Sequence, residues 1–203
     1  MQPVVIDWPS IQAVVFDLDN TLVSSALDFA WLRQQIGCSP TVDLLEHANN
    51  QATLAESQRA MQVIIDHELD DARHSHLMPG AQQLILALAE LKLHTAIVTR
   101  NCLEAAQIKL ERHQLNIERL ISREHFAPKP QPDALLALLD EWQLKPHQLL
   151  YVGDYIHDLN TAINAGTPSC LVNFHPQHQD FRRYASITVD NLQQLIPPLR
   201  QSR

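Results

Sequence analysis

The sequence predicts an α/β protein, with a Rossmann-like parallel sheet, helices on both faces, and an all-helical cap domain inserted after the first strand. Two observations predict this class. Short apolar runs rich in β-branched residues alternate with segments of helical periodicity along most of the chain. Residues 23–78, in contrast, contain helical patterns and no convincing strand.

Six short apolar runs are expected to form the strands of the sheet. They are Ala13–Phe16, His94–Val98, Arg119–Ile121, Leu149–Val152, Ser169–Val172 and Ile187–Val189. Helices are expected between them where apolar residues recur at three- and four-residue spacing, at Leu84, Leu88 and Leu91, at Leu103, Ala106 and Leu110, and at Leu135, Leu138, Leu139 and Trp142. Strands that alternate with amphipathic helices form βαβ units, so the sheet is expected to be parallel.

The helical segment of residues 23–78 is expected to form the cap, which leaves residues 1–22 and 79–203 for the core. Leu27 and Trp31 indicate its first helix, and Gly37 is expected to end that helix. A stripe of Met61, Ile64, Ile65 and Leu69 indicates helix packing. The sequence Met78-Pro79-Gly80 then marks the return to the core.

Composition limits the class of partner. The chain has 203 residues, 45% of them hydrophobic, which is enough for a buried core. Its net charge of −8 provides no broad basic field, so no nucleic-acid partner is expected, and an anionic substrate would need a few local cations and a metal. No stretch approaches the ~20 apolar residues of a spanning helix, and no signal peptide is visible, so a cytoplasmic location and no membrane partner are expected. Cys38, Cys102 and Cys170 are expected to be inert thiols.

Polar residues follow three of the expected strands. These clusters are Asp17-Leu18-Asp19-Asn20-Thr21, Thr99-Arg100-Asn101, and Gly153-Asp154 with Asp158 four residues later. In an open parallel sheet, ligands bind beyond the carboxyl ends of the strands. The clusters are far apart in the chain but are therefore expected to meet at one edge of the sheet.

The aspartates in these clusters indicate a metal site. In extended chain, Asp17 and Asp19 point to the same side, and clustered carboxylates repel unless a cation lies among them. An oxygen-only set suits Mg²⁺, and one carboxylate could attack while the other carries protons. Alternatively, Asp17 and Asp19 cap a turn and the next helix, and Asp158 is the N-cap of a helix ending near Ala165.

Three further residues indicate an anion site. Thr99 offers a hydroxyl and Asn101 an amide beside the N–H groups that open the next helix, although helix capping would also explain them. Lys129 stands in Pro128-Lys129-Pro130-Gln131-Pro132, where prolines stiffen the loop. A cation on a rigid loop suits phosphoryl oxygens, and the alternative is a solvated loop lysine. Gly153 is expected to let a ligand approach.

Together, these motifs resemble the haloacid dehalogenase superfamily, in particular phosphoglycolate phosphatase-like hydrolases with a small helical cap. The matching residues are Asp17-Leu18-Asp19-Asn20-Thr21, Thr99, Lys129-Pro130 and Gly153-Asp154-Tyr155-Ile156-His157-Asp158, and their order and spacing match over roughly residues 13–173. Asn20 stands where many relatives carry glycine, and both residues occur in such loops.

The resemblance implies a role for each of these residues. Asp17 would be the nucleophile, and Asp19 would protonate the leaving oxygen and then activate water. The phosphoryl oxygens would be held by Thr99, Arg100, Asn101, Lys129 and backbone N–H groups. Mg²⁺ would be the cofactor, bound by the Asp17 carboxylate, the Asp19 main-chain carbonyl and Asp154, with Asp158 as a ligand or an anchor.

The expected function is Mg²⁺-dependent hydrolysis of a small phosphorylated metabolite through an aspartyl-phosphate. A phosphomutase on a sugar phosphate, or a silent phosphate-binding regulatory module, remains an alternative. A dehalogenase is disfavoured because Asp19 is present, a phosphonatase because residues 24–78 contain no lysine, and a P-loop kinase because its motif is absent.

Substrate choice would be made by the cap. Arg33, Arg59 and Arg73 could contact a second anionic group, or could be solvated helix residues. The polar, loop-like segment His175–Arg183 is assigned no role, and the oligomeric state is not predicted.

Overall fold

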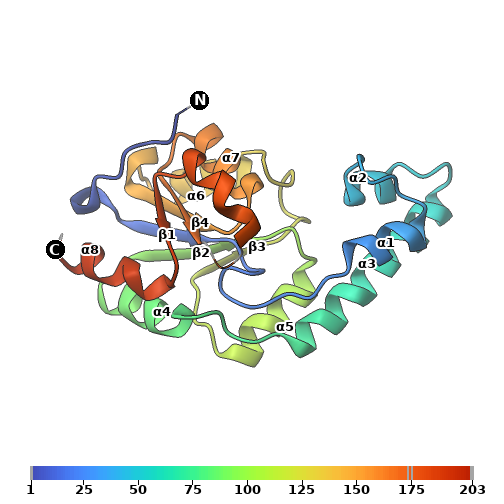
Figure 1. Ribbon diagram of the computed structural model, residues 1–203, viewed down its shortest axis with the longest axis horizontal. Helices are drawn as coiled ribbons and strands as arrows, with labels where there is room; N and C mark the ends of the chain where they lie inside the picture. Colours follow the sequence, from blue (N-terminus) through green and yellow to red (C-terminus); the bar gives the residue numbers. More distant parts are fainter. Residues whose placement is uncertain (1, 173, 175, 202–203) are drawn as a thin grey trace.

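The computed structural model describes residues 2–172, 174 and 176–201. It contains a six-stranded sheet in the order β3-β2-β1-β4-β5-β6, in which every neighbouring pair is parallel (Figure 1). The strands are β1 (Ala13–Phe16), β2 (His94–Val98), β3 (Arg119–Ile121), β4 (Leu149–Gly153), β5 (Ser169–Val172) and β6 (Ile187–Val189). All six predicted strands are confirmed, with β4 extended by Gly153.

Helices cover both faces of the sheet. The core helices are α4 (Ala81–Glu90), α5 (Leu103–His113), α6 (Asp133–Glu141), α7 (Ile156–Ala165) and α8 (Ile196–Gln201), with 3₁₀ segments η1 (Trp8–Ser10), η2 (Pro146–Gln148), η3 (Pro176–Tyr184) and η4 (Leu192–Leu195). The predicted loop His175–Arg183 is thus largely the 3₁₀ segment η3, and His175 lies outside the described residues.

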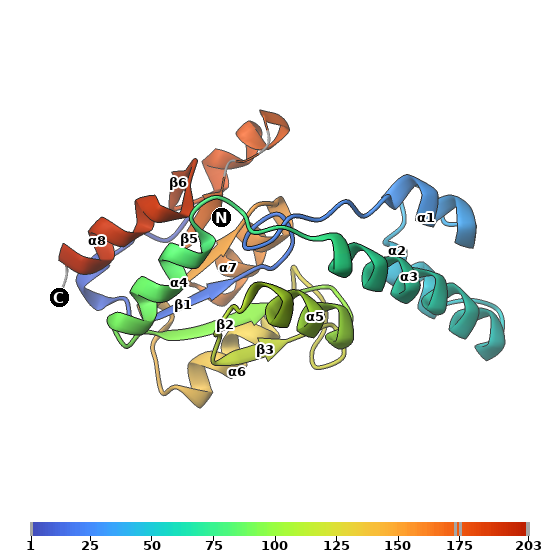
Figure 2. The same ribbon diagram turned by 90° about the horizontal axis from the view of Figure 1, so that it is seen from below.

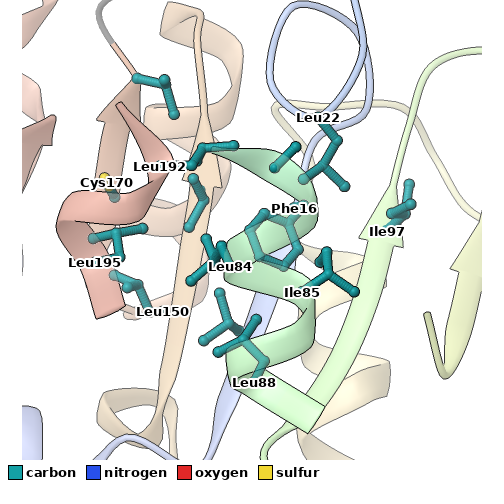
Figure 3. Packing of buried hydrophobic residues seen from close by; sticks show 14 of the residues in the cluster. Phe16, Leu22, Leu84, Ile85, Leu88, Ile97, Leu150, Cys170, Leu192 and Leu195 are labelled. Atoms are coloured by element: carbon teal, nitrogen blue, oxygen red, sulfur yellow. The ribbon is translucent and has the colours of Figure 1, made fainter. Parts of the chain in front are cut away.

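Residues of each strand alternate between two hydrophobic cores. Val14 and Phe16 of β1 face α4, α5, η4 and α8, and Figure 3 shows Phe16 beside Leu84 and Ile85 of α4. Val15 faces the opposite way, toward α6 and α7. A strand buried on both faces must be apolar at every position, which explains the uninterrupted run before Asp17.

The cap consists of α1 (Phe29–Ile36), α2 (Leu44–Asn49) and α3 (Leu54–His74), and projects from one end of the sheet (Figures 1 and 2). It has a small core of its own. The C-terminal part of α3 runs alongside α5, where Ala72 packs on Cys102 and Ala105. The stripe Met61, Ile64, Ile65 and Leu69 contributes to these two clusters, so its packing role is confirmed. The predicted fold class, with its helical cap, is confirmed.

The two linkers of the cap pair with each other. Ser24 N donates to the carbonyl of His76 (2.7 Å), and Met78 N donates to the carbonyl of Leu22 (2.9 Å). Gly37, with a φ of 68°, ends α1 as predicted. The prediction that Leu27 belongs to the first cap helix is wrong, because α1 begins at Phe29. Asp28 is its N-cap, and the Asp28 side chain accepts a hydrogen bond from Trp31 N (2.8 Å). The domain limits at residues 22/23 and 78/79 stay a prediction.

Two expectations from composition can be compared with the described residues. Cys38, Cys102 and Cys170 are buried free thiols, as predicted. Among the helices of the described residues, none has the length and apolar character needed to cross a membrane. The cytoplasmic location stays a prediction.

Candidate active site

Three aspartates meet at the carboxyl edge of the sheet. Asp17 directly follows β1, Asp154 directly follows β4, and Asp158 lies in the first turn of α7. One carboxylate oxygen of each lies within 4.8 Å of those of the other two, and all three residues are buried. The structure therefore brings together three of the four predicted metal ligands, and we call this set the acidic centre.

Lys129 supplies positive charge to the acidic centre. Its buried ammonium donates to Asp17 and, at 2.7 Å, to Asp158. Burial by itself would lower the pKa of Lys129, but Asp158 and Asp17 outweigh it and hold that pKa well above its usual value. Lys129 is thus a fixed cation inside the site, and the alternative of a solvated loop lysine is wrong.

One lysine does not balance the three carboxylates. Burial, followed by the charges of neighbouring aspartates, raises the pKa of Asp17 from 3.8 to about 7, in spite of Lys129. For the same reasons the pKa of Asp154 rises to about 8. The site therefore lacks positive charge at neutral pH. A buried, oxygen-only set with this deficit fits a hard divalent cation such as Mg²⁺, held by Asp17, Asp154 and Asp158.

Asp158 is held in place by its own helix. The alternative that Asp158 is the N-cap of α7 is wrong, because the N-cap is Tyr155. The Asp158 carboxylate instead accepts a hydrogen bond from Tyr155 N (3.1 Å). The Tyr151 hydroxyl also donates to it (3.3 Å). A Cβ on Gly153 would lie 2.4 Å from Asp158 Cβ and Cγ. The prediction that Gly153 admits a ligand is therefore corrected: the absent side chain makes room for Asp158.

The Asp19 carboxylate is not part of the acidic centre. It pairs with Lys109 Nζ (2.5 Å), and its side chain remains 19% exposed. Burial raises the pKa of Asp19, although Lys109 counteracts the rise. Lys109, which is fully buried, belongs to none of the motifs named above. The available signal was its spacing of four and three residues from the buried Ala105 and Ala106, which places a lysine on the inner face of α5.

Thr99 and Asn101 follow β2 and are both buried. Thr99 Oγ1 accepts from Asn101 N (3.1 Å). The Asn101 amide nitrogen lies close enough to Asp19 to lower its pKa, yet makes no hydrogen bond of regular geometry among the described residues. It is therefore a donor available to a ligand. Neither residue caps α5, whose N-cap is Cys102, so the capping alternative is wrong.

The N–H groups that open α5 do not face an empty anion site. Cys102 N donates to the Glu68 carboxylate of the cap (3.0 Å), and Leu103 N donates to the Glu124 carboxylate (3.0 Å). The expectation that a helix terminus attracts anions holds, but the anions are the protein's own. These two N–H groups are therefore not available to a phosphoryl group.

Arg100 lies between core and cap. Its guanidinium pairs with Asp43 (2.5 Å), whose carboxylate also accepts from Leu45 N (3.0 Å) at the start of α2. Burial would raise the pKa of Asp43, but Arg100 outweighs it and lowers that pKa. The guanidinium of Arg100, a residue of the core, thus binds Asp43 of the cap.

The three cap arginines differ in their surroundings. Arg33 donates to the carbonyls of Ser39 (2.6 Å) and Val42 (2.7 Å), within the cap itself. Arg59 and Arg73 are exposed. Arg33 therefore has a structural role in the cap.

The fold and the site together define a capped α/β enzyme with an acidic centre at the carboxyl edge of its sheet. The chain belongs to the haloacid dehalogenase-like hydrolases, whose family model matches residues 31–172. The resemblance inferred from the motifs is confirmed.

Individual relatives support this assignment. The chain is 30% identical to a phosphoglycolate phosphatase of Aliivibrio fischeri, over 84% of this chain and 88% of the relative. It is 23% identical to an N-acetylmuramic acid 6-phosphate phosphatase of Pseudomonas aeruginosa, over 93% and 95%. A solved haloacid dehalogenase-like hydrolase of Streptococcus pneumoniae shares the fold, with a TM-score of 0.72 and 19% identity over 92% of this chain and 97% of that one.

Proposed function

We propose that this protein is a Mg²⁺-dependent phosphatase that hydrolyses a small phosphorylated metabolite through an aspartyl-phosphate on Asp17. The observation that carries the proposal is the acidic centre, in which three buried carboxylates converge and one lysine pairs with two of them. Relatives named as phosphatases support it, since two of them act by name on phosphoglycolate and on N-acetylmuramic acid 6-phosphate.

Two aspartates would divide the covalent chemistry. An Asp17 oxygen attacks phosphorus, so that an O–P bond forms to Asp17 while the ester O–P bond breaks. Asp19 gives its proton to the departing oxygen and later takes one from the water that hydrolyses the aspartyl-phosphate. The raised pKa of Asp19 supports this role, because a carboxyl that keeps its proton closer to neutral pH has a proton to give to the departing oxygen.

The phosphoryl oxygens would be held by the Lys129 ammonium, the Thr99 hydroxyl and the Asn101 amide. Phosphoryl transfer depends mainly on positioning and on neutralising charge, so fixed donors of this kind suit it. Mg²⁺ bound by Asp17, Asp154, Asp158 and the Asp19 carbonyl would supply the missing positive charge. Arg100 belongs to the cap contact instead, and we assign it no direct phosphoryl contact.

The test is phosphate release from p-nitrophenyl phosphate with and without Mg²⁺. We expect turnover that requires Mg²⁺, and a loss of about 10³-fold or more in a folded Asp17→Asn variant. Asp140→Asn on the exposed face of α6 is a matched control and should keep full activity. Undiminished turnover by Asp17→Asn would exclude the proposed nucleophile. With a sugar monophosphate as substrate, conversion into its isomer without release of free phosphate would indicate a mutase.

A further inference from the structure

Lys109 is a fully buried lysine that joins the core to the cap. Its ammonium lies between Asp19, 2.5 Å away beside the acidic centre, and Asp71 of α3, 2.7 Å away in the cap. A buried ammonium is costly unless it is paired and hydrogen-bonded, so this side chain has little freedom to leave its two partners. We call Asp19, Lys109 and Asp71 the Lys109 cluster.

Asp71 is itself held by the first cap linker. Its carboxylate accepts from the Ser25 hydroxyl (3.0 Å) and from Ala26 N (2.6 Å). Ser25 N in turn donates to the side chain of Asn20, the neighbour of Asp19 (3.0 Å). A closed ring of contacts therefore runs from the Asp19 loop through the linker and the cap helix to Lys109 and back to Asp19.

This ring of contacts includes Asp19, whose carboxyl must be accurately placed for proton transfer. Proton transfer in a transition state requires the carboxyl to lie within hydrogen-bond reach of the departing oxygen, and misplacement by about 1 Å can cost about 10²-fold in rate. Because the Asp19 side chain is partly exposed, packing alone does not fix it. The Lys109 ammonium is the strong contact that does.

We propose that Lys109 is a positioning residue for proton transfer by Asp19, and that Asp71 of the cap holds Lys109 in place for that task. The inference rests on the proposed phosphatase function. It implies that the proton donor is correctly placed only when α3 of the cap is seated on α5.

A positioning role and a purely structural role of Lys109 predict different results for substrates with different leaving groups. An alkyl phosphate needs a proton on its departing oxygen, whereas p-nitrophenolate leaves as a stabilised anion and needs little help. Loss of Asp19 positioning should therefore harm the first substrate far more than the second. A general loss of structure would harm both alike.

The experiment compares kcat/KM for ethyl phosphate and p-nitrophenyl phosphate in Lys109→Met and Lys109→Arg. We expect Lys109→Met to lose about 30-fold or more on ethyl phosphate but less than about threefold on p-nitrophenyl phosphate. Lys109→Arg, which restores the charge, should recover part of the selective loss. Equal losses on both substrates, or none, would overturn the proposal.

Asp71→Asn covers the case in which Lys109→Met does not fold, because it keeps Lys109 paired with Asp19. We expect a smaller loss confined to ethyl phosphate, by about threefold to tenfold. Activity unchanged on both substrates would contradict the role of Asp71. Failure of the proposed function would look different, since the wild-type protein would then release no phosphate from either substrate.

Discussion

Two buried lysines stand at the same edge of the sheet, and their surroundings differ. Lys129 pairs with two of the three aspartates of the acidic centre, Asp17 and Asp158. The pKa values of Asp17 and of the third aspartate, Asp154, are raised to about 7 and about 8. Lys109 lies between two aspartates, one of which also accepts hydrogen bonds from neutral donors. With every group ionised, three aspartates and one lysine give the acidic centre a charge of −2, and two aspartates and one lysine give the Lys109 cluster −1. The larger deficit indicates a site that binds a cation, whereas a lysine paired with both of its aspartates indicates a fixed contact.

Replacing Lys129 should reduce activity more than replacing Lys109, and the pattern of the loss over two substrates should differ from that of Lys109. Lys129→Met should lose about 10²–10³-fold in kcat/KM on ethyl phosphate and p-nitrophenyl phosphate alike, because its ammonium would hold phosphoryl oxygens whatever the leaving group. Steady-state kinetics on both substrates measure this, with the exposed Lys145→Met as the control. A loss restricted to ethyl phosphate would place Lys129 in the role that we give to Lys109.

A smaller effect concerns stability and pH. The pKa values of Asp17 and Asp154 rise in the folded protein from 3.8 to about 7 and about 8. The folded state therefore binds more protons than the unfolded state between these values, and without a divalent cation its stability should fall as the pH rises through that window. Mg²⁺ competes with these protons, so it should raise the Tm more at about pH 8 than at about pH 5.5.

Thermal unfolding at both pH values, with and without Mg²⁺, measures this difference. Other titrating groups contribute equally to both series, so the effect of Mg²⁺ isolates the acidic centre. A Tm increase of the same size at the two pH values would show that the cation does not bind at these carboxylates.

The sequence predicts the acidic centre better than the Lys109 cluster for a physical reason. Asp17 and Asp154 directly follow strands, and parallel strands bring their carboxyl ends to one edge whatever their separation along the chain. Local pattern therefore locates these residues, together with Thr99 and Asn101. The six strands are predictable for the same reason, as short apolar runs bounded by polar residues.

Local sequence does not identify the partners in contacts that depend on how α3 packs on α5. Lys109 meets Asp71, and Glu68 meets Cys102 N, only through that packing. The spacing of Lys109 places it on the inner face of α5, but nothing in the immediate sequence indicates which residue of the cap will face it. Arg100 follows a strand like Thr99, yet its long side chain reaches Asp43 of the cap. A residue's position at the end of a strand therefore predicts where its backbone lies, but not where the tip of a long side chain lies.

The proposed function requires that Asp17, Asp154 and Asp158 bind one divalent cation. Calorimetric titration of Mg²⁺ into Asp154→Asn and Asp71→Asn tests this binding, because each variant removes one buried carboxylate charge, the first in the acidic centre and the second in the Lys109 cluster. We predict that Asp71→Asn binds Mg²⁺ like the wild-type protein and that Asp154→Asn loses at least about tenfold in affinity. Wild-type affinity in Asp154→Asn would contradict the account.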